Sequence, residues 1–235
     1  MGLLWRFDLA LLASINGFAR RNPVFDRFVV MLEGNSLLKI GLLVGLLWFA
    51  WFSAPAQSET RRRVALTVLT ACVAVLVARL GQRFLPERPR PIHDPGVQAR
   101  LPFHLEPTSH QDMSSFPSDH AVLLCALATG LWLISRRYGI LAFVLTAVDL
   151  VVRVYSGLHY PSDVLGGALL GIVIMGIAWR SRRLAPRVVD AALRTEALRP
   201  GAFYTVAFLL SWQIAEMFGD CRFLAFTLWS MAKEL

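Results

Sequence analysis

The chain has 235 residues, of which 56% are hydrophobic, and its mean hydropathy is +0.53. This length suits one domain, and the composition is too apolar for an ordinary soluble globular protein. The formal net charge is +8, but the basic residues lie almost entirely between the apolar runs or near their ends, which is typical of membrane proteins with basic loops and argues against a nucleic-acid-binding protein.

The N-terminal segment, residues 3–20, is only weakly apolar because Arg6, Asp8 and Asn16 interrupt it. Such a mixed pattern favours an amphipathic helix lying on the membrane over a further span. We therefore expect residues 1–30 to form an amphipathic N-terminal segment.

Apolar runs that predict transmembrane helices follow along the rest of the chain. They lie at 36–54, 63–85, 120–135, 138–153, 162–180 and 202–219. Several of their clean cores are shorter than the ~20 residues that span a bilayer, because polar groups occupy one end of each, and polar groups at that depth are usually functional. We predict an all-α integral membrane bundle of about six transmembrane helices plus the amphipathic helix. Residues 1–235 form one domain, with 202–219 as an extra C-terminal span.

The basic clusters indicate the orientation in the membrane. With six spans, 11 basic residues fall on one side and 13 on the other, but the clusters at 61–63, 136–137 and 180–183 all fall on the first side. The positive-inside rule places that side in the cytoplasm. We therefore expect a protein of the bacterial inner membrane whose other loops face the periplasm or exterior.

Three polar segments at the ends of spans share this outer side. Residues 83–91 read RFLPERPRP, residues 116–120 read FPSDH, and residues 153–163 read RVYSGLHYPSD. A long irregular loop, 91–116, joins the first two, and loops of this length in compact domains are usually functional.

These segments carry the groups of a phosphate site. Arginine presents planar donor forks that suit phosphoryl oxygens and keeps its charge at neutral pH. We expect Ser118 to cap the third span, so that free backbone N–H groups at the helix start face an anion. His159 and Asp163 are four residues apart, which lets the carboxylate reach one imidazole nitrogen and leave the other free to attack.

The three segments resemble the motifs of the type 2 phosphatidic acid phosphatase (PAP2) superfamily, K-x6-R-P, P-S-G-H and S-R-x5-H-x3-D, which cover core residues 83–163. The third motif is complete from its arginine onward. Arg83 replaces the family's lysine, Val152 replaces the serine, and Asp119 replaces the glycine. The resulting P-S-D-H is similar to that of bacitracin-resistance-type undecaprenyl diphosphate phosphatases. A carboxylate is unusual beside phosphate, so we expect Asp119 to bind a neighbouring arginine.

The resemblance implies a role for each matched residue. His159 is the expected nucleophile, Asp163 its orienting partner, and His120 the group that protonates the leaving oxygen and then activates water. The residues expected to bind the phosphoryl oxygens are Arg83, Arg90, Ser118 and Arg153. Outside the motifs, Asp149 lies four residues before Arg153, on the same helix face, and we predict that it pairs with this arginine in a supporting role.

The implied function is metal-independent hydrolysis of a membrane lipid phosphate, with no cofactor, through a phosphohistidine. Within it we favour a polyprenyl (undecaprenyl) diphosphate cleaved to the monophosphate. Phosphatidic acid, phosphatidylglycerol phosphate or lipid A phosphatases and phosphotransferases share the motifs, and a transporter or flippase of an anionic lipid is the alternative from another class. The expected partners are the lipid substrate and membrane lipids, with no nucleic acid and no obligate protein partner. His93, His104 and His110 lack the spacing of a metal site.

Overall fold

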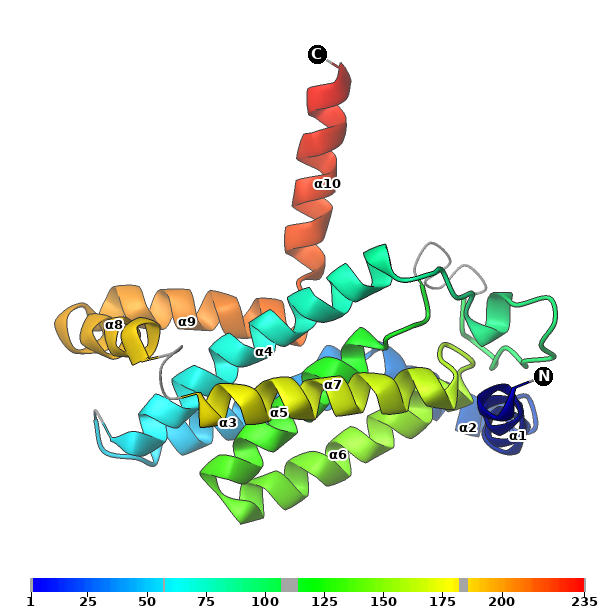
Figure 1. Cartoon of the computed structure of the whole chain (residues 1–235), viewed down its shortest axis with the longest axis horizontal. Coiled ribbons are helices and arrows are strands. Elements are labelled where there is room, and N and C mark those ends of the chain that lie inside the picture. The colour runs from blue at the N-terminus through cyan, green and yellow to red at the C-terminus, as the bar shows by residue number, and fades with distance from the viewer. Residues whose placement is uncertain (1, 57, 107–113, 182–185, 235) are drawn as a thin grey trace.

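The computed structural model describes the chain except for residues 1, 57, 107–113, 182–185 and 235, and the described part contains helices and no strand. Its helices are α1 (Leu3–Asn16), α2 (Pro23–Gly34), a π-helical turn (Leu37–Gly41) leading into α3 (Leu42–Phe52), α4 (Glu59–Phe84), a 3-10 turn (Pro91–His93), α5 (Asp119–Ile134), α6 (Arg136–Tyr155), α7 (Pro161–Arg180), α8 (Pro186–Leu198), α9 (Pro200–Ala215) and α10 (Gly219–Glu234). The predicted all-α class is confirmed, and Figure 1 shows the long helices as a bundle with the long connection that follows α4 at one end.

Helix α5 lies at the centre of the bundle and packs against α4, α6 and α7. Its residues 119–128 are all buried. Two glycines one turn apart let α7 approach it closely, since a Cβ at Gly167 would lie 2.5 Å from the Ser118 carbonyl oxygen and one at Gly171 would lie 2.2 Å from that of Val122. Small residues permit such close helix packing in membranes. The starts of α5 and α7, which carry the second and third motifs, are thereby held together.

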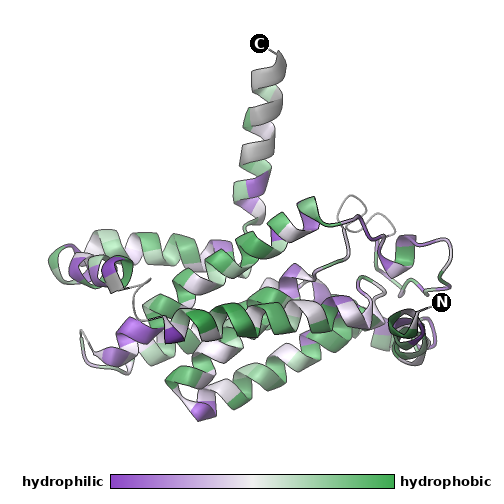
Figure 2. Ribbon diagram, in the orientation of Figure 1, coloured by the Kyte–Doolittle hydropathy of each residue, from purple (hydrophilic) through white to green (hydrophobic). Residues whose placement is uncertain are grey.

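The bundle helices have the composition of membrane spans. Within the described residues, α4, α6 and α7 are each long and apolar enough to cross a membrane, and the pair of Pro23–Gly34 and Leu37–Phe52, bent by 66°, is a fourth if it is counted as one span. Helix α5 is apolar but shorter. Figure 2 shows hydrophobic residues along the bundle and hydrophilic ones gathered at helix ends and loops. The chain is an integral membrane protein, and the predicted number of six spans stays a prediction.

Helix α1 runs across the bundle rather than along it and is seen nearly end-on in Figure 1. Two of its polar residues, Asp8 and Asn16, face the protein and are buried, while Leu3 and Phe7 are exposed. Asn16 Nδ2 donates to the backbone oxygens of Tyr155 at 2.7 Å and of Arg100 at 2.8 Å. A helix with this arrangement presents its apolar face to lipid, as an interfacial helix does.

The C-terminal region departs from the sequence prediction. The expected span at 202–219 corresponds to α9, which ends at Ala215, and a turn then leads into α10. Met217 and Phe218 in this turn have φ of 53° and 56°, so the chain changes direction where the apolar run continues. Figure 1 shows α10 projecting from the bundle at a steep angle to α9. Apolar periodicity alone did not predict this corner.

Candidate active site

His159 lies in the short turn between α6 and α7, where it is almost fully buried. Gly157 makes this turn with a φ of +67°, a conformation that residues with a Cβ adopt with difficulty. The imidazole Nδ1 lies 2.9 Å from the backbone oxygen of Ser115, and Nε2 lies 3.0 Å from Arg90 Nη1. A carbonyl oxygen can only accept, so Nδ1 carries the proton and Nε2 keeps its lone pair.

The electrostatics of the turn keep this ring neutral. Burial, and after it the charges of Arg90 and Arg153, hold the pKa of His159 well below its usual range. Burial lowers the pKa of Arg90 to about 10, which still leaves it charged at neutral pH. A neutral imidazole whose unprotonated Nε2 faces a buried guanidinium has the state that a nucleophile for phosphorus needs.

Asp163 lies farther from His159 than the spacing predicts. Its Oδ2 is 4.0 Å from His159 Nδ1, which is too long for a hydrogen bond. The hydroxyl of Ser115 donates to Oδ2 at 2.6 Å, and the backbone N–H of Tyr160 donates to it at 2.9 Å. The predicted direct bond is therefore replaced by a link through Ser115, whose hydroxyl binds the carboxylate and whose carbonyl holds the ring. Sequence reasoning missed Ser115 because it lies just before the P-S-D-H motif.

His120 occupies the first turn of α5 and is held by Asp119. The Asp119 Oδ1 lies 3.1 Å from His120 Nδ1 and accepts the His120 backbone N–H at 2.9 Å. The other oxygen, Oδ2, lies 3.1 Å from Arg79 Nη2, so the expectation that Asp119 binds an arginine is confirmed. This pairing puts the proton on Nδ1 and leaves Nε2 of His120 for proton transfer.

Ser118 caps α5 as predicted, accepting from the backbone N–H of Ala121 at 3.5 Å, and its own N–H donates to the Asp163 carbonyl at 3.3 Å. It is fully buried and does not line the cavity described below. In this structure Ser118 joins the starts of α5 and α7, and its role in binding the phosphoryl oxygens stays a prediction.

The two histidines open onto one small cavity of about 50 Å³. Its lining consists of two histidines (His120, His159), four arginines (Arg79, Arg90, Arg153, Arg222), Asp119 and Met217. Arg83 is exposed and lies outside this lining, and Arg79, one turn earlier in α4, lies within it. The cavity combines guanidinium donors for phosphoryl oxygens with two imidazoles, which suits phosphoryl transfer.

Arg153 is almost fully buried and is held by two carboxylates. Its Nε lies 3.6 Å from Asp149 Oδ2, and its Nη1 lies 3.1 Å from Glu33 Oε1 in α2. The predicted contact with Asp149 is thus present, whereas Glu33 was missed because it is 120 positions away in the chain. Neither Nε nor Nη2 of Arg153 has a hydrogen-bond partner in the described residues, because the Asp149 contact is an ion pair longer than a hydrogen bond, so donors remain for a ligand.

Arg88, which sequence reasoning left out, ties α1 to the site. Its guanidinium forms an ion pair with Asp163, lies 2.7 Å from Asp8 Oδ2 and donates to Ser162 Oγ at 2.9 Å. Asp8 also accepts the Ser162 backbone N–H at 2.8 Å. The N-terminal helix therefore helps position the start of α7. Asp8 was the sequence signal that could have indicated this contact, because it is an acidic residue in a segment expected to lie on the membrane.

Among the described residues, no group of three or more His, Cys, Asp or Glu side chains could hold a metal ion. His110 lies outside the described residues. The metal-free mechanism is a prediction, and a chelation experiment tests it below.

Comparison with known proteins identifies a family, sequence relatives and a similar fold. Residues 83–187 match the model of the PAP2 superfamily. The chain is similar to undecaprenyl-diphosphatase BcrC of Bacillus subtilis, with 25% identity over 77% of this chain and 87% of that protein. It is 35% identical, over 73% of its length and 89% of the relative, to decaprenylphosphoryl-5-phosphoribose phosphatase of Mycobacterium tuberculosis. The fold is similar to the crystal structure of a transmembrane PAP2-type phosphatidylglycerolphosphate phosphatase from Bacillus subtilis, with a TM-score of 0.55, 20% identity, and coverage of 78% and 90% of the two chains.

Proposed function

We propose that this chain, which belongs to the PAP2 superfamily, hydrolyses undecaprenyl diphosphate to the monophosphate through a phosphohistidine intermediate. The chain is a membrane phosphatase of lipid phosphates, in line with the phosphatases to which it is similar. The observation that carries the proposal is the cavity in which His159 and His120 meet four arginines. Both relatives compared above are named for polyprenyl-linked substrates, which supports a polyprenyl lipid for this site.

In the proposed reaction, Arg90 and Arg153 bind the oxygens of the distal phosphoryl group. His159 Nε2 attacks its phosphorus, a P–N bond forms and the bond from phosphorus to the bridging oxygen breaks. At this step His120 carries a proton on Nε2 as well as on Nδ1, gives the Nε2 proton to the departing oxygen and becomes neutral. Water, activated by His120, then attacks the phosphohistidine and releases inorganic phosphate and free His159. Splitting the reaction lets the arginine cage stabilise two related transition states.

An apolar cavity beside the site supports a lipid substrate. It has a volume of about 340 Å³ and is lined by residues of α3, α4, α5, α8 and α9, and ligand pockets measure roughly 300–1,000 Å³. Ile214 of α9 lines this cavity, and Met217, three residues later in the turn after α9, lines the arginine cavity. A lipid with a phosphate headgroup would find an arginine-lined cavity for the phosphate and an apolar cavity for its hydrocarbon chain. We assign the apolar cavity to the first part of that hydrocarbon chain.

The orientation in the membrane is part of the proposal. Arg61 and Arg62, from the first basic cluster, form ion pairs with Glu196 and Asp190 of α8 at the start of α4, the opposite end of that helix from Arg79. We propose that this end faces the cytoplasm and that the histidines face the periplasm, in the bacterial inner membrane.

Two measurements test the function. Purified protein in detergent is given undecaprenyl diphosphate, phosphatidic acid, phosphatidylglycerol phosphate and lipid A, and phosphate release is measured. We expect the fastest turnover with the diphosphate. Release from none of these lipids would favour a transporter, and transfer to a second lipid in place of water would indicate a phosphotransferase.

The second measurement traps the intermediate. We expect His120→Ala to slow formation and hydrolysis of an acid-labile, base-stable phosphoenzyme, because it removes the proton-transfer group. We expect His159→Ala to form none, because it removes the nucleophile. Phosphate trapped on the His159→Ala protein would reverse the two assignments.

A further inference from the structure

The corner between α9 and α10 forms one wall of the catalytic cavity, although it lies beyond residues 83–187 that match the family. Met217 and Arg222 of this corner line the cavity. Met217 and Phe218 have φ of 53° and 56°, a region that costs energy for residues with a Cβ and persists only where the surroundings enforce it. The Phe218 N–H donates to the Gln213 carbonyl at 2.6 Å, and Arg79 Nη2 donates to the Met217 carbonyl at 3.2 Å. The corner is thus tied to the site through Arg79.

The charges of the cavity are balanced unevenly. Arg79 pairs with Asp119, and Arg153 pairs with Glu33 and Asp149. In the part of the chain that the structure describes, no carboxylate pairs with the remaining two cavity arginines, which are Arg90 and Arg222. Each of them therefore has charge available for an anionic ligand.

The two unpaired arginines have different neighbours in the cavity. Arg90 lies against the nucleophile, with Nη1 3.0 Å from His159 Nε2. Arg222 extends from the corner, where its Nε donates to the Phe218 carbonyl at 3.4 Å, and it is close enough to Arg79 for their like charges to repel. It is exposed, at the rim of the cavity. One cation therefore lies at the nucleophile, and the other lies at the corner between α9 and α10.

We infer that Arg222 binds a second phosphate, the one between the transferred phosphoryl group and the lipid, and so makes the site selective for diphosphates over monophosphates. This inference rests on the proposed function. When His159 attacks the distal phosphorus, the bond to the bridging oxygen breaks and its electron pair remains on the lipid monophosphate. A guanidinium beside that group stabilises the charge that develops on it. A lipid monophosphate instead releases an alkoxide oxygen, which takes a proton from His120 and has no phosphate for Arg222 to bind.

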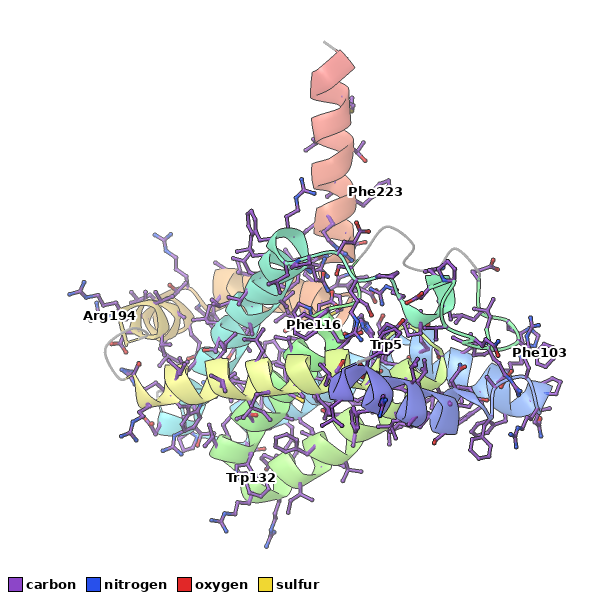
Figure 3. The ribbon with its side chains drawn as sticks, turned by 45° about the vertical axis from the view of Figure 1, so that its right-hand side comes forward. Trp5, Phe103, Phe116, Trp132, Arg194 and Phe223 are labelled. Atoms are coloured by element: carbon purple, nitrogen blue, oxygen red, sulfur yellow. The ribbon has the colours of Figure 1, made fainter. Side chains whose placement is uncertain are left out.

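The test compares Arg222→Gln with Arg194→Gln in the full-length protein. Arg194 is an exposed arginine of α8, and Figure 3 shows it at the left edge of the molecule, away from Phe223, the neighbour of Arg222 in α10. The substrates are farnesyl diphosphate and farnesyl monophosphate in the same detergent, and kcat/KM is measured for both. Thermal unfolding in detergent checks that the variants fold.

We expect Arg222→Gln to lower kcat/KM for the diphosphate by about 10- to 100-fold, the effect of losing one hydrogen-bonded charge, and to change that for the monophosphate by less than about 3-fold. Arg222→Lys should restore part of the loss, and Arg194→Gln should match the wild type on both substrates. An equal loss on both substrates, or no loss on the diphosphate, would overturn the inference and leave the phosphatase assignment intact. A wild-type protein that cleaves neither substrate would overturn the proposed function, and the inference with it.

Discussion

Replacing Asp149 by Asn tests how the buried arginine of the third motif is aimed. Asp149 and Arg153 are 6% and 1% exposed, and their closest charged atoms, Oδ2 and Nε, are 3.6 Å apart. At an effective dielectric constant of about 20, unit charges at this distance attract by about 5 kcal/mol, and the desolvation of both groups offsets much of that. Asn keeps the shape and one hydrogen-bonding oxygen and removes the charge.

The second carboxylate limits the damage. Removing one partner of a buried pair costs about 3–5 kcal/mol in stability, but Glu33 still lies 3.1 Å from Arg153 Nη1 in the variant. We therefore expect a loss of stability at the lower end of this range. A guanidinium that is less well positioned should stabilise the transition state by about 1.4–2.8 kcal/mol less, which is about a 10- to 100-fold loss in kcat. The loss should be the same for every lipid, because all of them share the phosphate.

The assay measures kcat on two different lipid phosphates, together with thermal unfolding in detergent. Asp190→Asn is the matched control, because Asp190 forms an ion pair with Arg62 and its side chain is 36% exposed. Exposed ion pairs contribute about 0–1 kcal/mol to stability. Glu33→Gln and the double variant complete a cycle, in which the double loss should exceed the sum of the single losses because each carboxylate substitutes for the other. If Asp149→Asn folds normally and turns over at the wild-type rate, Asp149 has no part in positioning Arg153.

Three further predictions follow from the site and the adjoining cavity. Because burial lowers the pKa of His159, the ring stays neutral as the pH falls below about 6.5, the ordinary imidazole value. The acid limb of phosphoenzyme formation in single-turnover experiments should thus lie below that pH, and a limb at or above it would contradict the assignment. Activity should survive EDTA and be inhibited by vanadate, which imitates the trigonal-bipyramidal phosphoryl group, and loss on chelation that a divalent ion restores would refute the metal-free route. Ala207→Trp should fill the apolar cavity that Ala207 lines and lower kcat/KM for undecaprenyl diphosphate more than for a short water-soluble phosphate ester. The control Val148→Trp, on the exposed face of α6, should change neither value. Equal losses on both substrates would show that the hydrocarbon chain of the lipid does not bind in this cavity.

The sequence by itself determined the class of fold and the identity of the central groups. In a bilayer each helix must satisfy its own backbone hydrogen bonds and present apolar side chains to lipid. The long helices could therefore be predicted from their apolar runs without knowing their neighbours. The contact of Asp149 with Arg153 could be predicted for a similar reason, since positions four apart on one helix meet wherever that helix lies. The pairing of His159 with Asp163 was less well predicted, because the intervening Ser115 comes from another segment.

Only the tertiary structure decided which arginines reach the cavity and what holds them. Arg79 lines the cavity and Arg83 does not, because the packing of α4 against α5 sets the depth of each turn. Glu33 and Arg222 reach the site from α2 and α10, elements far from the motifs in the chain. Local periodicity carries no information about such meetings. They depend on how whole helices pack and on where the chain turns between them, and those are properties of the assembled bundle.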